Sequence, residues 1–259
     1  ADPKNINFAK GSPSEGERYQ YRADNKDWEA IASAYAGGPL IKDKLFAFIA
    51  VEGARREGTN VGSVSTTRTT QYRYDDPKLY GKIDWNINDS NILELTGASY
   101  KDEYSGGIYA YDNDTNTRGA YRNAATIENT KQTMWLAKYT SYITDTLTLT
   151  AQYGKQKTAF YTQPAQTDPN LIYITGAGQQ NPAFNGGVAG GIGNAQNLRD
   201  IDDPAHESKG SNYRVDLAWT LGDHTLTFGI DNQNTQDNND GTFVYGDAGY
   251  SWSYGTVKE

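Results

Sequence analysis

The stretch LYGKIDWNINDSNILELTG, residues 79–97, alternates apolar and polar side chains on both sides of a short turn. Before the turn, Leu79, Ile83 and Trp85 fall on one face, whereas Lys82 and Asp84 fall on the other. A period of two is typical of a β-strand, in which neighbouring side chains point to opposite faces. The stretch therefore predicts an antiparallel hairpin with one apolar face and one charged face.

Turns of this kind occur four times in the chain, each centred on an aspartate and flanked by alternating residues. They lie at 41–45, 87–92, 143–147 and 221–226, and long polar stretches separate one hairpin from the next. Short turns at one end and long loops at the other are typical of a membrane-spanning β-barrel, whose strands need only about 10 residues each.

The bulk composition excludes several classes of protein. The chain has 259 residues, a formal net charge of −8 and no cysteine. The acidic balance disfavours nucleic-acid binding, which needs a basic surface, and without cysteine no disulfide or thiolate metal site can form. Only 36% of the residues are hydrophobic, and no apolar run approaches the roughly 18 residues of a transmembrane helix. A barrel is compatible with such low hydropathy because only every second strand residue faces lipid.

We expect an all-β fold, a transmembrane antiparallel β-barrel, over the whole chain 1–259. About eight strands in four hairpins are expected at 28–236, between an extracellular loop at 1–27 and a loop or strand extension at 237–259. The long extracellular loops within this region are expected at 57–77, 105–130 and 162–211. No secretory signal opens the chain, and we expect it to be a piece of a longer protein.

The alternation assigns residues to the two sides of every hairpin. The residues expected to face lipid are Leu79, Ile83, Trp85, Leu147, Leu149, Val215, Leu217, Trp219, Leu226, Phe228 and Ile230. The residues expected to face a wet lumen are Lys82, Asp84, Glu94, Lys138, Arg214, Asp216 and Asp231.

One segment resembles a known family. GGPLIKDKLFAF at 37–48, followed by Glu52-Gly53 and Arg55-Arg56, is similar to the early barrel of TonB-dependent outer-membrane receptors, in their Oar-like branch. The resemblance implies a 22-stranded barrel closed by an N-terminal plug domain that this chain lacks. The chain would then be the N-terminal part of that barrel, about a third of the receptor.

The same resemblance implies a function and its partners. The receptor would capture a bulky ligand (a peptide, glycan or chelate) with its extracellular loops and pass it through the plugged barrel. The periplasmic energy-coupling protein TonB would drive this step through the plug. The protein would cross the lipid bilayer of a Gram-negative outer membrane many times, and its lumen charges would contact the plug.

Aromatic residues of the long loops are the candidate ligand contacts. Tyrosine offers a flat surface with a polar tip at a low entropic cost. The alternative interpretation is that these side chains pack the loops together above the barrel. The candidates, with two neighbouring aspartates, are Tyr104, Tyr109, Tyr111, Asp112, Asp114, Tyr121, Tyr161, Tyr173 and Phe184.

We expect no cofactor, no metal and no catalysis. The acidic loops at 112–116 and 199–207 offer the oxygen ligands that Ca²⁺ binds, but neither has the spacing of an EF-hand. Solvated loops are the simpler interpretation. The glycine run at 186–193 lacks the Lys-Ser/Thr of a phosphate-binding loop. Of the two histidines, His206 lies in the second acidic loop and His224 in a turn.

Two other hypotheses remain open from the sequence. Eight strands could close on themselves as a structural or adhesive outer-membrane barrel, although the chain lacks the terminal aromatic strand of many such barrels. A soluble β-sandwich or glycan-binding domain is the other hypothesis. A sandwich would bury the side that bears Val215 and Phe228 beneath a second sheet.

Overall fold

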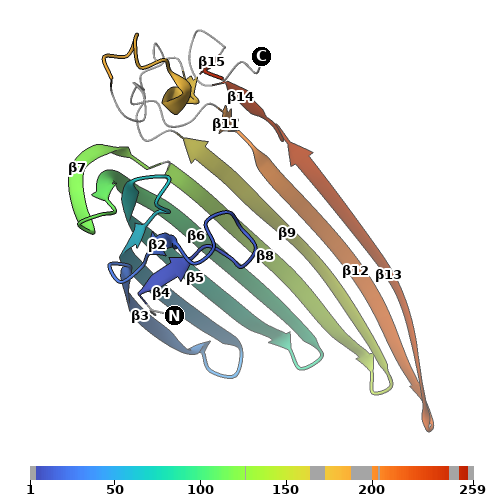
Figure 1. The fold of residues 1–259 in the computed structure, drawn as a ribbon. Coiled ribbons are helices and arrows are strands. Elements are labelled where there is room, and N and C mark those ends of the chain that lie inside the picture. The colour runs from blue at the N-terminus through green and yellow to red at the C-terminus, as the bar shows by residue number, and fades with distance from the viewer. Residues whose placement is uncertain are drawn as a thin grey trace.

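A single large sheet dominates the protein (Figure 1). The computed structural model describes residues 4–125, 127–163, 173–187, 200–203, 205–244 and 251–255. Eight long antiparallel strands follow one another across the sheet in the order β13-β12-β9-β8-β6-β5-β4-β3. They are β3 (Lys26–Ile41), β4 (Leu45–Val61), β5 (Arg68–Asn88), β6 (Asn91–Asp112), β8 (Ile127–Thr144), β9 (Leu147–Gln163), β12 (Glu207–Leu221) and β13 (His224–Asn238). The predicted four antiparallel hairpins are confirmed.

Smaller elements gather at the end of the sheet opposite the short turns (Figure 1). There β7 (Thr117–Ala124) pairs with the end of β6. Three two-stranded sheets also form in the described part of the chain. They are β1 (Asn5–Asn7) with β2 (Arg18–Tyr21), β10 (Tyr173–Thr175) with β15 (Ser251–Ser253), and β11 (Asp200–Asp202) with β14 (Thr242–Val244). A 3-10 helix spans Ala177–Gln179, and no described helix is long and apolar enough to cross a bilayer.

The tight turns end the strands where the aspartates predict. Asp43 adopts a left-handed backbone conformation with φ 60°, which aspartate tolerates better than most residues. In the last hairpin Gly222 has φ 59°, a value that suits glycine at the first central position of a two-residue turn. The Asn88 side chain accepts the Ser90 N–H at 3.0 Å and so supports the second turn.

The sheet has two chemically different faces. Residues paired directly across strands share a face, and the register is continuous from β4 to β13 over the central part of the sheet. The outer face is defined here as the one that bears Leu79 and Ile83, and the inner face as the one that bears Lys82 and Asp84. The register places all eleven residues predicted to face lipid on the outer face.

Large apolar side chains on the outer face are open to the surroundings. Phe228 is 59% exposed and Val215 is 41% exposed. Among the described residues, the buried hydrophobic side chains are Val61, Tyr111 and Ala125, all of them far from the short turns. A soluble sheet buries one face to offset the entropy of folding. No second sheet covers the outer face in the described part of the chain, which disfavours the β-sandwich hypothesis.

The strands are longer than the sequence predicts, and this corrects the expected loop boundaries. Strand ladders occupy much of the loops expected at 57–77 and 105–130, and β9 and β12 extend into both ends of the one expected at 162–211. The expected loop at 1–27 contains β1, β2 and the start of β3. Backbone pairing continues above the segment that a bilayer covers, where neither face needs an apolar pattern. Residues 164–172 and 188–199, with most of the glycine run, lie outside the described residues.

Val215 tests the chemical difference between the two faces. A cation on the lipid side of a barrel strand near the bilayer midplane costs about 2–4 kcal/mol. We therefore expect Val215→Arg to lower the free energy of unfolding by that amount, as measured by denaturant titration of the full-length protein in lipid vesicles. Thr150→Arg is the control, because Thr150 pairs with Asp216 on the inner face. Equal losses for the two variants would contradict the assignment of the faces.

Candidate functional site

A row of polar side chains crosses the inner face at one level. The register links Asp84 on β5 to Glu94 on β6, Lys138 on β8, Gln152 on β9, Arg214 on β12 and Asp231 on β13. This inner row therefore runs over six neighbouring strands, each contributing one residue. All seven residues predicted to face the lumen lie on the inner face, in this row or two positions from it.

Ion pairs hold the first half of the inner row together. Lys82 Nζ lies 2.7 Å from a carboxylate oxygen of Asp84 and 3.0 Å from Glu94 Oε1. Lys138 Nζ lies 2.9 Å from Glu94 Oε2, so Glu94 bridges two lysines. Asp84 and Glu94 are direct cross-strand neighbours, and like charges at such positions repel each other. Lys82 offsets that repulsion.

In the second half of the row the contacts run along and across β12. Arg214 Nε and Nη2 lie 2.6 and 3.1 Å from the two carboxylate oxygens of Asp216. Asn212 donates to Asp231 at 2.6 Å across the β12–β13 pair. These side chains are partly exposed, so each pair contributes no more than about 1 kcal/mol to stability. Their alignment gives the inner face a polar, hydrogen-bonding surface.

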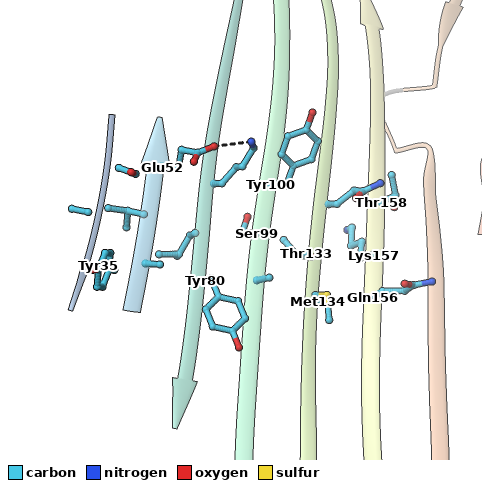
Figure 2. A pocket seen from close by; sticks show the side chains of 18 residues that line it. Tyr35, Glu52, Tyr80, Ser99, Tyr100, Thr133, Met134, Gln156, Lys157 and Thr158 are labelled. Atoms are coloured by element: carbon cyan, nitrogen blue, oxygen red, sulfur yellow. Dashed lines mark hydrogen bonds and ion pairs between the residues drawn. The ribbon is translucent and has the colours of Figure 1, made fainter. Parts of the chain in front are cut away.

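A groove of about 580 Å³ lies along the sheet above the inner row (Figure 2). Tyr80 and Tyr100 line it from the inner face, together with Met134. At its edge Lys78 Nζ lies 2.8 Å from Glu52 Oε1 (Figure 2). The groove thus combines aromatic surface with one ion pair, the mixture that holds organic ligands in protein sites.

Sequence reasoning missed the residues of this groove. The sequence alone assigns Tyr80 to the polar face, because Tyr80 alternates with Leu79 and Gly81. The spacing along one strand does not reveal which side chains of neighbouring strands converge. Phe48 extends the aromatic surface, with its ring 6.0 Å from that of Tyr80 and 6.2 Å from that of Tyr35.

Tyr104 continues this aromatic surface towards the long-loop end. Its ring lies 4.9 Å from that of Tyr74, and Tyr74 lies 5.8 Å from Tyr72. Arg56 stands over the Tyr72 ring at 6.0 Å and pairs with Asp27 at 3.2 Å. Tyr104 therefore lies on a strand of the sheet and not in a loop, and burial raises the pKa of its phenol.

The neighbouring candidates pack the end of the sheet. Tyr109 faces Tyr121 across the β6–β7 pair at 5.4 Å, and Arg118 stacks on Tyr109 at 4.8 Å. Tyr111 is 4% exposed and donates its hydroxyl to Asp24 at 3.0 Å. Burial, reinforced by this hydrogen bond, raises the pKa of Tyr111. Tyr121 is 57% exposed.

The acidic turn between β6 and β7 is shaped by its own backbone. Asp112 Oδ1 accepts the N–H groups of Asp114 and Thr115 at 2.8 and 3.1 Å. The backbone N–H of Thr115, followed by that of Asp114, lowers the pKa of Asp112. The Asp112 carboxylate thus caps a turn, as short polar side chains commonly do.

The remaining candidates lie towards the same end of the sheet. Tyr161 lies near the end of β9 and is 38% exposed, Tyr173 begins β10, and Phe184 is 89% exposed in a turn. His206 stacks on the Phe160 ring at 4.7 Å. Residues 199 and 204 of the second acidic loop lie outside the described residues.

Comparison with known proteins identifies the family. Residues 57–258 match the model of a family described as an outer membrane beta barrel domain. No curated protein and no solved structure matches the chain significantly. The matched region covers β5 to β13 and the last residues of β4, including the whole inner row. The chain belongs to the outer membrane beta-barrel domain family, and its place is the bacterial outer membrane.

Proposed function

We propose that this barrel domain works in a TonB-dependent receptor, which captures a bulky ligand outside the cell and passes it through a gated lumen. The inner row carries the proposal. Charged side chains on five of its six strands require a wet interior or a polar partner, because isolated charges are not stable in a dry one. A plug domain is the partner that we propose for them.

The edges of the sheet support a wide barrel. Within the described residues β3 pairs with β4 and β13 with β12, and each leaves its other edge free. Unpaired N–H and C=O groups cost several kcal/mol each in hydrocarbon, so a sheet in a membrane must close. We propose that further strands pair with β3 and β13. An eight-stranded closure would leave an interior just filled by side chains, with little room for a ligand path along the groove.

The aromatic side chains between the groove and the long-loop end support the proposed capture of a ligand. Tyr35, Tyr80 and Tyr104 mark a path on the inner face from the groove to the long-loop end, where Tyr121 and Phe184 are exposed. Aromatic surfaces with polar tips suit peptides, glycans and chelates alike. In this proposal the tyrosines that pack the sheet also present their free edges to the ligand.

A plug that rests on the inner row should respond to the loss of Glu94. Glu94→Gln leaves Lys82 and Lys138 without the carboxylate that bridges them, and a contact of this kind is worth about 1 kcal/mol. We expect several-fold higher uptake of a large hydrophilic antibiotic by cells that produce the full-length protein. Asp145→Asn, in a short turn, is the control of equal charge change. Unchanged uptake in Glu94→Gln, at equal protein levels, would count against a plugged lumen.

Energy coupling is tested separately. Photo-crosslinking of the full-length protein in intact cells should yield an adduct with a TonB-class periplasmic protein, because the force on the plug needs direct contact. The adduct should increase when ligand-containing growth medium is supplied. A protein that folds in the outer membrane but forms no such adduct would support the self-contained structural or adhesive barrel instead.

A further inference from the structure

Five lysines gather on the outer face just beyond the apolar band. They are Lys101 on β6, Lys131 on β8, Lys155 and Lys157 on β9, and Lys209 on β12. The register links Lys101 to Lys131, and Lys157 to Lys209, so they form one patch over four neighbouring strands. This lysine patch lies on the same face as Val215 and Phe228, in a chain whose net charge is −8.

The depth of the lysines, measured from the short turns, covers a limited range. Each lysine lies about eight to twelve residues from the turn that ends its strand, roughly 26–40 Å along the strand. With the usual strand tilt of about 40°, these lengths correspond to heights of roughly 20–31 Å above the turns. This range includes the roughly 25 Å height of the apolar band. The patch therefore lies where hydrocarbon gives way to lipid head groups, on the long-loop side. In this family that side faces the outside of the cell.

The patch carries an excess of positive charge. On the same face of these strands the carboxylates are Glu103, which pairs with Lys101, and Glu207, which pairs with both Lys157 and Lys209. Hydrogen bonds from these two lysines lower the pKa of Glu207 to about 2. Five lysines against two carboxylates leave three positive charges. Lys131 and Lys155 form no ion pair within the described residues.

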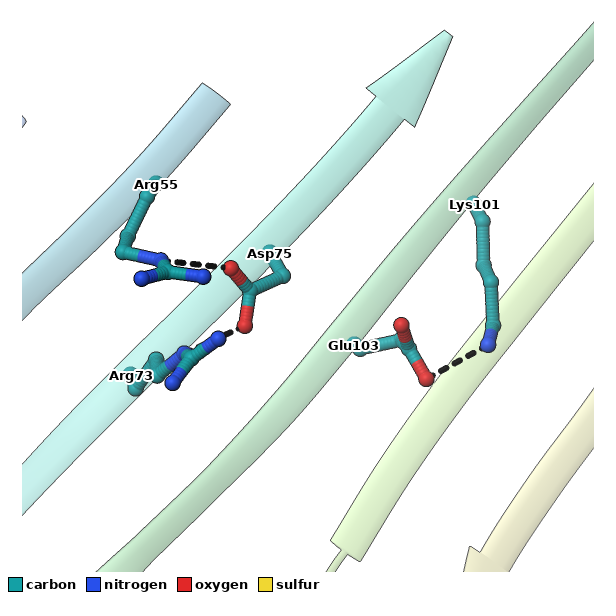
Figure 3. A network of polar contacts seen from close by, with 5 residues as sticks. All are labelled: Arg55, Arg73, Asp75, Lys101 and Glu103. Atoms are coloured by element: carbon teal, nitrogen blue, oxygen red, sulfur yellow. Dashed lines mark hydrogen bonds and ion pairs between the residues drawn. The ribbon is translucent and has the colours of Figure 1, made fainter. Parts of the chain in front are cut away.

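The neighbouring part of the outer face is more nearly balanced. Arg55 Nε lies 2.8 Å from Asp75 Oδ1, and Arg73 binds the other oxygen of the same carboxylate (Figure 3). The excess charge is thus concentrated on β8, β9 and β12, where exposed Lys155 and Lys157 lie two positions apart.

A groove of about 460 Å³ opens between these lysines. Trp135, Lys155, Lys157, Lys209, Ser211 and Asn234 line it from β8, β9, β12 and β13. Below it, Trp135 lies 5.4 Å from Tyr153 edge to face, and Lys155 Nζ stands 5.7 Å from the Tyr153 ring. The groove thus offers cations at its top, hydroxyl and amide groups at its side, and aromatic rings at its base.

We propose that this groove binds the phosphorylated sugar head group of an outer-leaflet glycolipid of the lipid A class. The lysines would bind its phosphates, and Ser211 and Asn234 would bind its sugar oxygens. Its acyl chains would lie against Trp135, Tyr153 and Val215. Charge complementarity selects this occupant, because the outer leaflet of such a membrane consists largely of phosphorylated glycolipid and the groove meets it at head-group height.

Binding of defined lipids tests the proposal. The full-length protein, extracted from its native membrane, is titrated in detergent with bis-phosphorylated lipid A, with the same lipid after dephosphorylation, and with phosphatidylglycerol. Native mass spectrometry measures the fraction that carries lipid. We expect the bis-phosphorylated lipid to bind at least tenfold more tightly than the other two. Equal binding of the three lipids would overturn the proposal, and this comparison needs no variant.

A pair of variants locates the site. Each lysine near a charged lipid surface contributes about 1 kcal/mol, so Lys155→Gln with Lys157→Gln should weaken lipid A binding about 30-fold, equivalent to about 2 kcal/mol. Lys42→Gln with Lys44→Gln removes the same charge from the short turn at the opposite membrane surface. Equal weakening in both double variants, or none in the first while it remains folded by circular dichroism, would overturn the site.

Discussion

Hydrocarbon cannot hydrogen-bond the backbone, and this constraint governs every level of the structure. Each strand that crosses a bilayer must satisfy its N–H and C=O groups with neighbouring strands. The protein meets the requirement with uninterrupted ladders: β9 and β12 pair residue for residue from Glu207 to Trp219, and β12 and β13 along their whole lengths. Because the backbone bonds are satisfied in this way, the side chains are free to differ completely between the two faces.

Much of the fold could be predicted from the sequence where the bilayer imposes a pattern. The alternation around Ile83 and Trp85, and the aspartate turns, locate four hairpins and the two faces. The same alternation predicts strands that are too short, because beyond the bilayer a strand such as Arg68–Asn88 needs only backbone pairing. There Asp75 and Tyr74 alternate without a hydrophobic period. Nothing in such a segment distinguishes it from a polar loop.

The candidate site shows a similar division. All seven charged residues predicted on the polar face lie there, because alternate residues of a strand share a face. The cross-strand partners could not be predicted, since register depends on turn length and bulges. Glu94 faces Lys138 in the register of β6 and β8, two strands that are joined along the chain through β7 and not by a tight turn. The groove beside Tyr80 and Tyr100 depends on three or more strands at once, which no single-strand pattern encodes.

The two faces of one strand also explain why polar and charged side chains occur on different faces at different positions along it. On β9, Gln152 contributes to the inner row while Ala151 and Tyr153 present apolar surface on the other side. Four residues further, Lys155 and Lys157 occupy the outer face that Leu149 occupies deeper in the membrane. In the proposed membrane placement, a lysine at the depth of Leu149 would face hydrocarbon without a partner, whereas at the depth of Lys157 its long side chain would reach the head groups. The alternation along a strand decides which face of the sheet a side chain lies on. The distance from the short turn decides whether a charge on that face is stable. Both are therefore needed to predict the role of a residue in this sheet.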